Sequence, residues 1–183
     1  AFATLAARVI PHGFPVIENL QPVAPKPRND GRLRLLVLGR MQTGKGQQLL
    51  ARALAGLTTH VQVYLVGTGK SGEAFFGLSG VDVILEYKRE ELPAILAEIG
   101  PDFAALLSIV PETFSYTLSE LQQMQIPVIA TRVGSFPGRI EDGKTGWLVE
   151  PEPEALVRLV ASLCRSPGQI GTVRANLPAI MAN

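Results

Sequence analysis

The chain has 183 residues and a formal net charge of +1, and 46% of its residues are hydrophobic. This composition is typical of a globular domain with a sizeable core and excludes a disordered chain. Both signs of charge are spread along the sequence, so the basic patch that DNA or RNA binding requires is lacking, and no nucleic-acid partner is expected.

Cysteine and histidine are scarce. The single cysteine, Cys164, excludes an internal disulfide framework, and His12 and His60 are too far apart in sequence to form a metal-ligand pattern. No apolar run approaches the roughly 20 residues that span a bilayer. These features favour a cytoplasmic protein.

The first 32 residues differ in amino-acid composition from the rest of the chain. Their high proline content opposes regular structure and predicts a linker or wrapping segment over residues 1–32. The chain starts with Ala rather than Met, and no clear sequence signal marks the end of a domain at its C-terminus. Both features predict a fragment of a longer protein.

From Leu33 onward, apolar strands alternate with amphipathic helices. The expected strands are residues 33–38, 61–66, 81–85, 103–109, 127–130 and 147–149. The expected helices are residues 47–57, 92–99, 115–124 and 156–163. These elements predict one domain over residues 33–166, followed by a weakly helical, truncated C-terminal tail over residues 167–183.

This order of elements predicts an α/β fold of the Rossmann-like type, an open parallel sheet with helices on both faces, because parallel strands need crossover connections. Ligands of such sheets bind where loops leave the carboxyl ends of the strands. The candidate functional segments are therefore the loops at 39–46, 67–72, 86–90, 110–115 and 131–146.

Two glycine-rich stretches raise the question of a phosphate-binding P-loop, whose pattern is GxxxxGK[ST]. Residues 138–145, GRIEDGKT, match at every fixed position. Yet no strand precedes them, and the residues that follow, 146–149, oppose the helix start that would present amide groups to a phosphate. We therefore interpret this stretch as a turn, which Asp142-Gly143 and Thr145-Gly146 favour.

Residues 39–46, GRMQTGKG, miss the pattern only at the last position, but a strand precedes them and a helix follows. Gly46 cannot ligate Mg²⁺ as the P-loop hydroxyl does, so an ATPase or other metal-dependent phosphohydrolase is disfavoured. The loop still places Arg40 and Lys45 beside a helix N-terminus. Such cations predict a diphosphate site without metal; the alternative is that both are ordinary solvated charges.

Glu112 and Glu120 lie on either side of the join between a strand and the following helix. The peptide N–H groups of residues 114–116 would be unpaired at that helix start. Carboxylates accept hydrogen bonds from sugar hydroxyls and free amides suit a phosphate, so this segment predicts a sugar-nucleotide pocket. The alternatives are a solvated loop charge for Glu112 and, for Glu120, a capping box that begins at Thr117.

Several segments follow one another in an order typical of one enzyme family. They are Leu38–Gly46, Val66–Gly69, Glu112–Glu120, Pro127–Thr131, Val133–Gly134 and Ile140–Val149. In these segments the chain resembles the C-terminal, donor-binding half of the retaining GT-B glycosyltransferases of group 1 (family 4). Val9–Gly13 is similar to the segment at the end of that family's first domain, so the resemblance covers nearly the whole chain.

The resemblance implies one half of a GT-B fold that binds a nucleotide-diphosphate sugar and needs no metal or other cofactor. Arg40 and Lys45 would hold the diphosphate and stabilise its negative charge as it leaves. Glu112 would bind hydroxyls of the donor sugar, which makes Arg40, Lys45 and Glu112 the catalytic residues. Glu120 would bind the ribose. The other donor-binding residues would be Gly39, Gly67, Tyr87, Lys88, Thr113, Phe114, Ser115 and Tyr116.

The sequence departs from the family pattern at a few positions. Thr113 and Ser115 stand where the family usually has glycines, and Gly138 stands where it often has glutamate. Side chains at positions 113 and 115 are expected to narrow the donor pocket or to mark a different donor.

The resemblance also implies a missing N-terminal domain that binds the acceptor. We therefore expect the isolated chain to bind donor weakly and to be inactive as a transferase. The complete enzyme is expected to act in polysaccharide or glycolipid assembly, with peripheral association at the inner face of the membrane through the missing domain. The alternative is a non-catalytic nucleotide- or sugar-binding module on the same sheet, which Thr113 and Ser115 favour.

Overall fold

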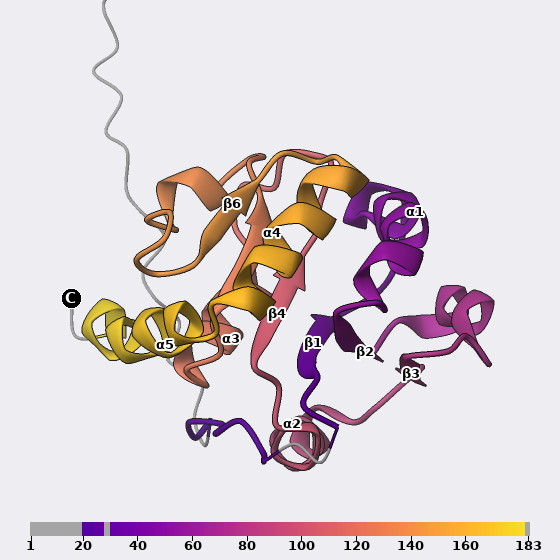
Figure 1. Cartoon of the computed structure of the whole chain (residues 1–183), viewed down its shortest axis with the longest axis horizontal. Coiled ribbons are helices and arrows are strands. Elements are labelled where there is room, and N and C mark those ends of the chain that lie inside the picture. The colour runs from indigo at the N-terminus through magenta and orange to yellow at the C-terminus, as the bar shows by residue number, and fades with distance from the viewer. Residues whose placement is uncertain (1–19, 28–29, 182–183) are drawn as a thin grey trace, which may run out of the picture.

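A six-stranded parallel sheet forms the centre of the computed structural model, which describes residues 20–27 and 30–181 (Figure 1). The strands are β1 (Leu33–Leu38), β2 (Val61–Val66), β3 (Val81–Ile84), β4 (Phe103–Leu106), β5 (Val128–Thr131) and β6 (Trp147–Val149). Their order is β3-β2-β1-β4-β5-β6, with every neighbouring pair parallel. The expected Rossmann-like sheet is confirmed, and the strand order reverses between β1 and β4, where such sheets bind ligands.

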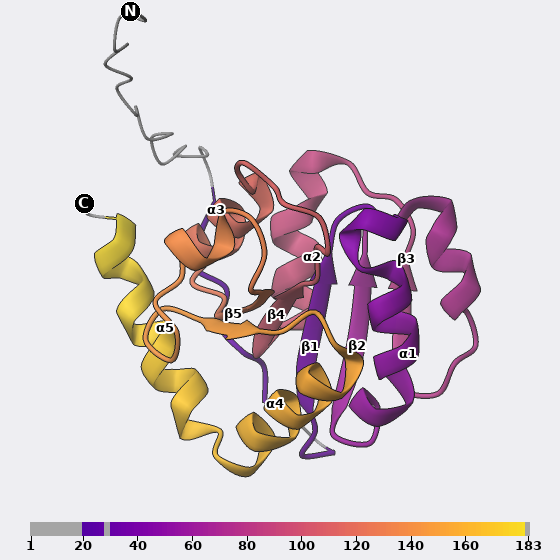
Figure 2. The same ribbon diagram turned by 90° about the horizontal axis from the view of Figure 1, so that it is seen from above.

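Helices cover both faces of the sheet. They are α1 (Gln47–Leu57), α2 (Leu92–Ile99), α3 (Tyr116–Gln123), α4 (Pro153–Arg165) and α5 (Gly168–Met181). Figure 2 shows α1 and α4 on one side of the strands and α2 and α3 on the other. Successive strand residues point to opposite faces, so in β1 Leu35 packs into the core with α1 and α4, whereas Leu36 packs into the core with α2 and α3.

Short 3₁₀ helices stand in several of the loops. They are η1 (Thr43–Lys45), η2 (Gly69–Phe75), η3 (Arg89–Glu91) and η4 (Phe136–Gly138). η1, η2 and η3 follow β1, β2 and β3 at the carboxyl edge of the sheet, and η4 follows β5. The candidate loops therefore have defined backbone conformations.

Three strands have bounds that differ from the sequence prediction. β4 ends at Leu106, not at residue 109, because the chain then leaves the sheet and Ile109 N–H donates to the carbonyl of Gly44 at 2.9 Å. β3 ends one residue earlier than expected, and β5 spans 128–131 rather than 127–130. The helix expected at 115–124 is α3, whose N-cap is Ser115.

The residues after Pro167 form a well-packed helix rather than a weakly helical tail. In α5, Ile170, Val173 and Leu177 are buried on one face. Between them, the Arg174 guanidinium donates hydrogen bonds of 2.7–3.0 Å to the carbonyls of Val23, Pro101, Asp102 and Gln125. Arg174 thus binds this helix to the segments that precede β1, β4 and β5, at the amino-terminal edge of the sheet.

Only part of the proposed linker at residues 1–32 can be placed. Within the segment 20–27, Val23 is buried and its N–H donates to the carbonyl of Met124 at 2.9 Å. The segment Val9–Gly13, on which part of the family resemblance rests, lies outside the described residues.

Candidate functional site

Two adjoining pockets open at the carboxyl ends of the central strands. The polar lining of the first, between the loops after β1 and β4, is Arg40, Lys45, Ser108, Glu112, Ser115 and Thr117. The second, between the loops after β1, β2 and β3, is lined by Gly67, Gly69, Leu85, Glu86, Tyr87 and Arg89. Gly39 and Arg40 line both pockets, so the two adjoin along this edge and are together called the groove.

The loop over residues 39–46 cannot act as a P-loop for a steric reason. Gly46 caps α1 with a left-handed backbone, φ 82°. A Cβ at this position would lie 2.0 Å from the carbonyl oxygen of Leu107. No side chain fits there, so the hydroxyl that would ligate Mg²⁺ in a P-loop is excluded by the packing of this loop against the residues after β4.

The second P-loop match, residues 138–145, is a turn, as the sequence predicted. Gly143 N–H donates to the carbonyl of Gly146 at 2.8 Å, and Thr145 N–H to that of Glu141 at 2.9 Å. Strand β6 follows directly, so no helix N-terminus is available to bind a phosphate.

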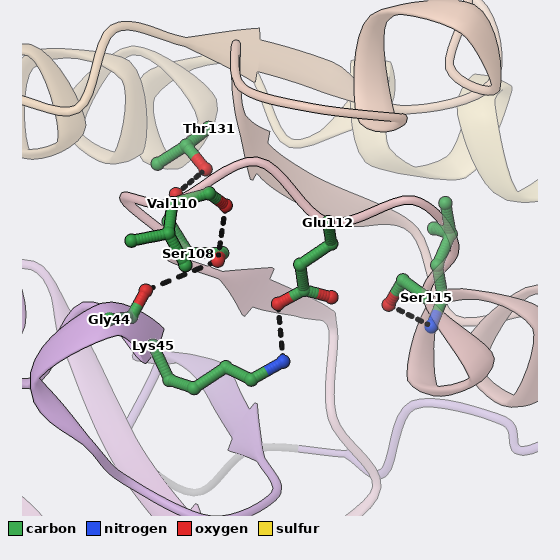
Figure 3. A network of polar contacts seen from close by, with 8 residues as sticks. Gly44, Lys45, Ser108, Val110, Glu112, Ser115 and Thr131 are labelled. Carbon is green, nitrogen blue, oxygen red and sulfur yellow. Dashed lines mark hydrogen bonds and ion pairs between the residues drawn. The ribbon is translucent and has the colours of Figure 1, made fainter.

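Lys45 and Glu112 form an ion pair across the first pocket (Figure 3). The Glu112 side chain is only 15% exposed and the Lys45 side chain 48%. The backbone of Glu112 is held in place, because Ser135 N–H donates to its carbonyl at 2.9 Å and a Cβ on Gly134 would lie 2.5 Å from its nitrogen. The carboxylate is therefore the more buried partner and the lysine the more exposed one.

Glu120 forms a second ion pair, with Arg89, at an N–O distance of 2.7 Å. A capping box at Thr117 is excluded, because α3 begins at Tyr116 and the Ser115 hydroxyl accepts the N–H of Leu118 at 3.2 Å. Burial raises the pKa of Glu120, and the charge on Arg89 lowers it by less. Glu120 thus pairs with an arginine of the second pocket and does not cap the helix.

The Tyr87 ring forms one wall of the second pocket. It lies so close to Gly67 that a Cβ there would come within 2.5 Å of Tyr87 Cε1. Burial and the nearby Glu120 carboxylate raise the pKa of the phenol, so Tyr87 is neutral near pH 7. A flat, neutral ring beside a glycine turn offers a surface on which a planar group can stack.

Replacing Glu120 by Gln is expected to stabilise the folded chain at pH 7.5 by about 0.5–1 kcal/mol. Its pKa is raised above the ordinary value of 4.5 in the folded state, so ionisation costs stability at every pH above the folded pKa. The gain should shrink as the pH falls through the window between the folded pKa and 4.5. Urea denaturation at several pH values measures it.

The control for this experiment is Glu98→Gln. The hydrogen bond from Lys26 lowers the pKa of Glu98, so this substitution should lower stability, and its effect should fade as the pH drops through the folded pKa. A Glu120→Gln substitution that destabilises the chain, or whose effect does not depend on pH, would contradict the raised pKa of Glu120.

The predicted site residues divide into two groups. Those that line the groove are Gly39, Arg40, Lys45, Gly67, Tyr87, Glu112 and Ser115. Those that do not line it are Lys88, Thr113, Phe114, Tyr116 and Glu120, of which Glu120 is joined to it through Arg89. Thr113 lies outside both pockets, whereas Ser115 lines the first pocket and its hydroxyl caps α3.

Arg139 supports this site although the sequence did not single it out. Its guanidinium lies 4.2 Å from the centre of the Phe114 ring and donates to Ser115 O at 2.9 Å and to Ser119 Oγ at 2.8 Å. Burial lowers the pKa of this guanidinium. The sequence analysis did not predict a role for Arg139, because it lies in the turn segment 138–145 and its hydrogen-bond partners are 20–24 residues away in sequence.

Neither a membrane helix nor a metal-ligand cluster is found in the part of the chain that the structure describes. No helix there is long and apolar enough to cross a bilayer. Nor do three or more His, Cys, Asp or Glu side chains gather there in a way that could hold a metal ion.

Curated proteins with similar sequences are D-inositol 3-phosphate glycosyltransferases. The one from Arthrobacter sp. (strain FB24) is 31% identical over 132 residues, which is 66% of this chain and 31% of the relative. The one from Corynebacterium kroppenstedtii is 33% identical over 144 residues, 69% of this chain and 32% of the relative. The chain thus spans about a third of the length of these relatives.

Solved structures share the fold. The structure of Anabaena Alr3699/HepE in complex with UDP and glucose matches with a TM-score of 0.69 at 23% identity, over 82% of this chain and 43% of that one. The C-terminal domain of a glycosyl transferase group 1 family protein (LpcC) from Francisella tularensis matches with a TM-score of 0.66 at 19% identity, over 87% and 86%.

A family model agrees with these similarities and covers the whole sheet. The model of the glycosyl transferases group 1 matches residues 32–166, from the residue before β1 to the residue after α4. This match includes both pockets and both ion pairs. The chain therefore belongs to the glycosyl transferases group 1 family.

Proposed function

We propose that this chain binds the nucleotide-diphosphate sugar donor of a retaining glycosyltransferase. One observation carries the proposal: a pocket with two cations and a largely buried carboxylate adjoins a pocket walled by a neutral aromatic ring, and Arg40 lines both. A sugar nucleotide has the same order of groups, with a diphosphate between a sugar and a planar base.

In this proposal the diphosphate lies at Arg40 and Lys45. Each charge-assisted hydrogen bond contributes about 1.5–3 kcal/mol. The sugar hydroxyls bind Glu112, the base stacks on Tyr87, and Glu120 accepts the ribose hydroxyls beside Arg89. The charge of the two basic side chains suits a site that works without a metal ion.

Donor binding must change the ion pair between Lys45 and Glu112. A diphosphate carries more charge than one carboxylate, so it attracts the more exposed lysine, and Glu112 is then free to accept sugar hydroxyls. When the glycosidic bond breaks, negative charge grows on the leaving diphosphate, where Arg40 and Lys45 stabilise it. This exchange of partners links binding of the diphosphate to recognition of the sugar.

The acceptor is expected to bind elsewhere in a longer protein. The chain spans about a third of the length of the curated relatives, so we propose that residues 1–32 lead from a separate acceptor-binding domain and that residues 33–166 form the donor domain. Residues 167–183, which include α5, are proposed to form a C-terminal helical tail of this domain. The isolated chain should bind donor and transfer no sugar. Polysaccharide or glycolipid assembly is the proposed setting for the complete enzyme.

Calorimetric titration of the chain with UDP, GDP, ADP and their sugar conjugates, without metal, tests the proposal. UDP and UDP-glucose are the first probes, because HepE was solved with UDP and glucose. Lys45→Ala should weaken diphosphate binding by about 10- to 100-fold, in keeping with the loss of one charge-assisted hydrogen bond. Glu112→Gln should retain or strengthen UDP binding, because it frees Lys45, and should abolish any preference for the sugar conjugate.

Lys144→Ala is the matched control. Lys144 is an exposed lysine that pairs with Glu141 in the turn before β6, outside both pockets, and its loss should leave all affinities unchanged. Binding of one diphosphate that is lost with Lys45→Ala supports the proposal. Equal binding by Lys45→Ala, or no binding of any nucleotide by the folded chain, would overturn it.

A further inference from the structure

The two loops that carry Lys45 and Glu112 are joined by a buried hydrogen-bond network that crosses three neighbouring strands (Figure 3). The Thr131 hydroxyl, at the end of β5, donates to the carbonyl of Ser108. The Ser108 hydroxyl lies 3.2 Å from the carbonyl of Gly44 and 3.0 Å from that of Val110. Ser108 is 3% exposed and Thr131 is fully buried.

Each end of this network stands next to a charged group of the first pocket. Gly44 immediately precedes Lys45 in the loop after β1, and Val110 lies two residues before Glu112 in the loop after β4. The carbonyl of Gly44 also accepts the N–H of Ile109, at 2.9 Å. The Val110 side chain packs over Gly44, where a Cβ would come within 3.2 Å of Val110 Cγ2. The two loops are therefore in direct contact next to both charged groups.

The network has no role in the sheet itself. β4 has already ended at Leu106, and Ser108 lies beyond the ladder between β4 and β5. The carbonyl of Ser108 is buried and needs a donor, which the Thr131 side chain supplies from the neighbouring strand. The Ser108 hydroxyl has one proton and two acceptors in reach, one in each loop, so it donates to one carbonyl or is shared between the two.

We infer that Ser108 and Thr131 are positioning residues of the donor site, which set the separation between Lys45 and Glu112. This inference rests on the proposed function. The diphosphate-binding cation and the sugar-binding carboxylate belong to different loops, and their relative placement decides whether both reach one donor. The hydrogen bonds of Ser108 and Thr131 hold the backbones next to Lys45 and Glu112 at this placement. The side chain of Lys45 is not part of these hydrogen bonds.

Substitutions at Thr131 offer a matched pair. Thr131→Val keeps the shape of the side chain and removes the hydroxyl, whereas Thr131→Ser keeps the hydroxyl and removes a methyl group. Thr131→Val should weaken UDP-glucose binding by about tenfold, as expected for the loss of one buried hydrogen bond, and Thr131→Ser should restore most of the affinity. Ser108→Ala should resemble Thr131→Val.

A double-mutant cycle separates positioning from a general loss of structure. If Thr131 acts through the placement of Lys45, then Thr131→Val should change UDP-glucose affinity by less than about twofold in a Lys45→Ala background, as measured by NMR titration. If Thr131 only maintains the fold, the two effects should multiply. Multiplying effects, or equal affinities of Thr131→Val and Thr131→Ser, would overturn the inference.

Amide hydrogen exchange in the ligand-free chain tests the same hydrogen bonds without any nucleotide. The N–H of Ile109, which is bonded to Gly44, should exchange about tenfold faster in Thr131→Val and Ser108→Ala than in Thr131→Ser, with the amides of β1 and β2 unchanged. Unchanged exchange at Ile109 would overturn the inference even if the wild-type chain bound no nucleotide. Failure of the proposed function alone would leave the exchange result intact.

Discussion

Replacing Gly46 by Ser will complete the P-loop pattern GxxxxGK[ST] in the loop after β1 and will destabilise the chain instead of creating an Mg²⁺-dependent nucleotide site. Two independent penalties apply. The backbone at Gly46 has φ 82°, which is unfavourable for any residue with a Cβ. The Cβ would also lie 2.0 Å from the carbonyl oxygen of Leu107, a backbone atom that cannot turn aside.

The expected loss is about 3–5 kcal/mol, because strain and a backbone clash act together. Urea denaturation measures it, and titration with ATP with and without Mg²⁺ tests for a new site. The control is Gly138→Ser in the second P-loop match. There φ is not positive and a Cβ would meet nothing within 4 Å, so stability should change by less than about 0.5 kcal/mol. A stable Gly46→Ser chain that binds ATP only with Mg²⁺ would contradict the steric argument.

Arg174→Met should destabilise the chain by about 3–5 kcal/mol, the effect expected when a buried charged group that satisfies several partners is removed. Arg174 donates four hydrogen bonds to backbone carbonyls from three segments: the stretch before β1, the turn before β4 and the turn before β5. Methionine fills similar space but leaves these carbonyls without their donor. Burial lowers the pKa of the guanidinium, and the nearby Asp102 carboxylate raises it by less.

Arg158→Met, on the exposed side of α4, makes the same chemical change without these partners and should alter stability by less than about 0.5 kcal/mol. The denaturation midpoint measures both variants. Equal midpoints would show that the network around Arg174 contributes nothing measurable. A lower midpoint for Arg174→Met would show that α5 is part of the folding unit and not an appended tail.

The layered architecture could be predicted from the sequence because its signals are local. Apolar runs such as 33–38 and 61–66, and stripes at helical spacing in 47–57 and 92–99, depend only on neighbouring residues, and the structure places these elements as expected. The alternation of the two types then dictates parallel strands. Loops at the carboxyl edge followed from that topology, which is why Arg40, Lys45 and Glu112 were predicted to share one edge.

Contacts between loops could not be predicted in the same way. Arg139 meets Ser115 and Ser119 across 20–24 residues, and Thr131 meets Ser108 across 23. Each of these side chains has polar neighbours in sequence that would serve equally well as partners. The choice among them depends on the path of each loop in space, and no periodic pattern records that path.

The same distinction explains two departures from the sequence prediction, the regular helix at α5 and the early end of β4. α5 contains Gly168, Gly171 and Pro178, so its intrinsic helix propensity is low, and its helix is stabilised by burial and by the distant carbonyls around Arg174. β4 stops at Leu106 because the next residues bind the loop after β1. The sequence by itself thus determined the type and order of the elements and the edge at which the site lies. Only the tertiary structure decided where those elements end and which side chains meet, because hydrogen-bond partners are selected by long-range packing.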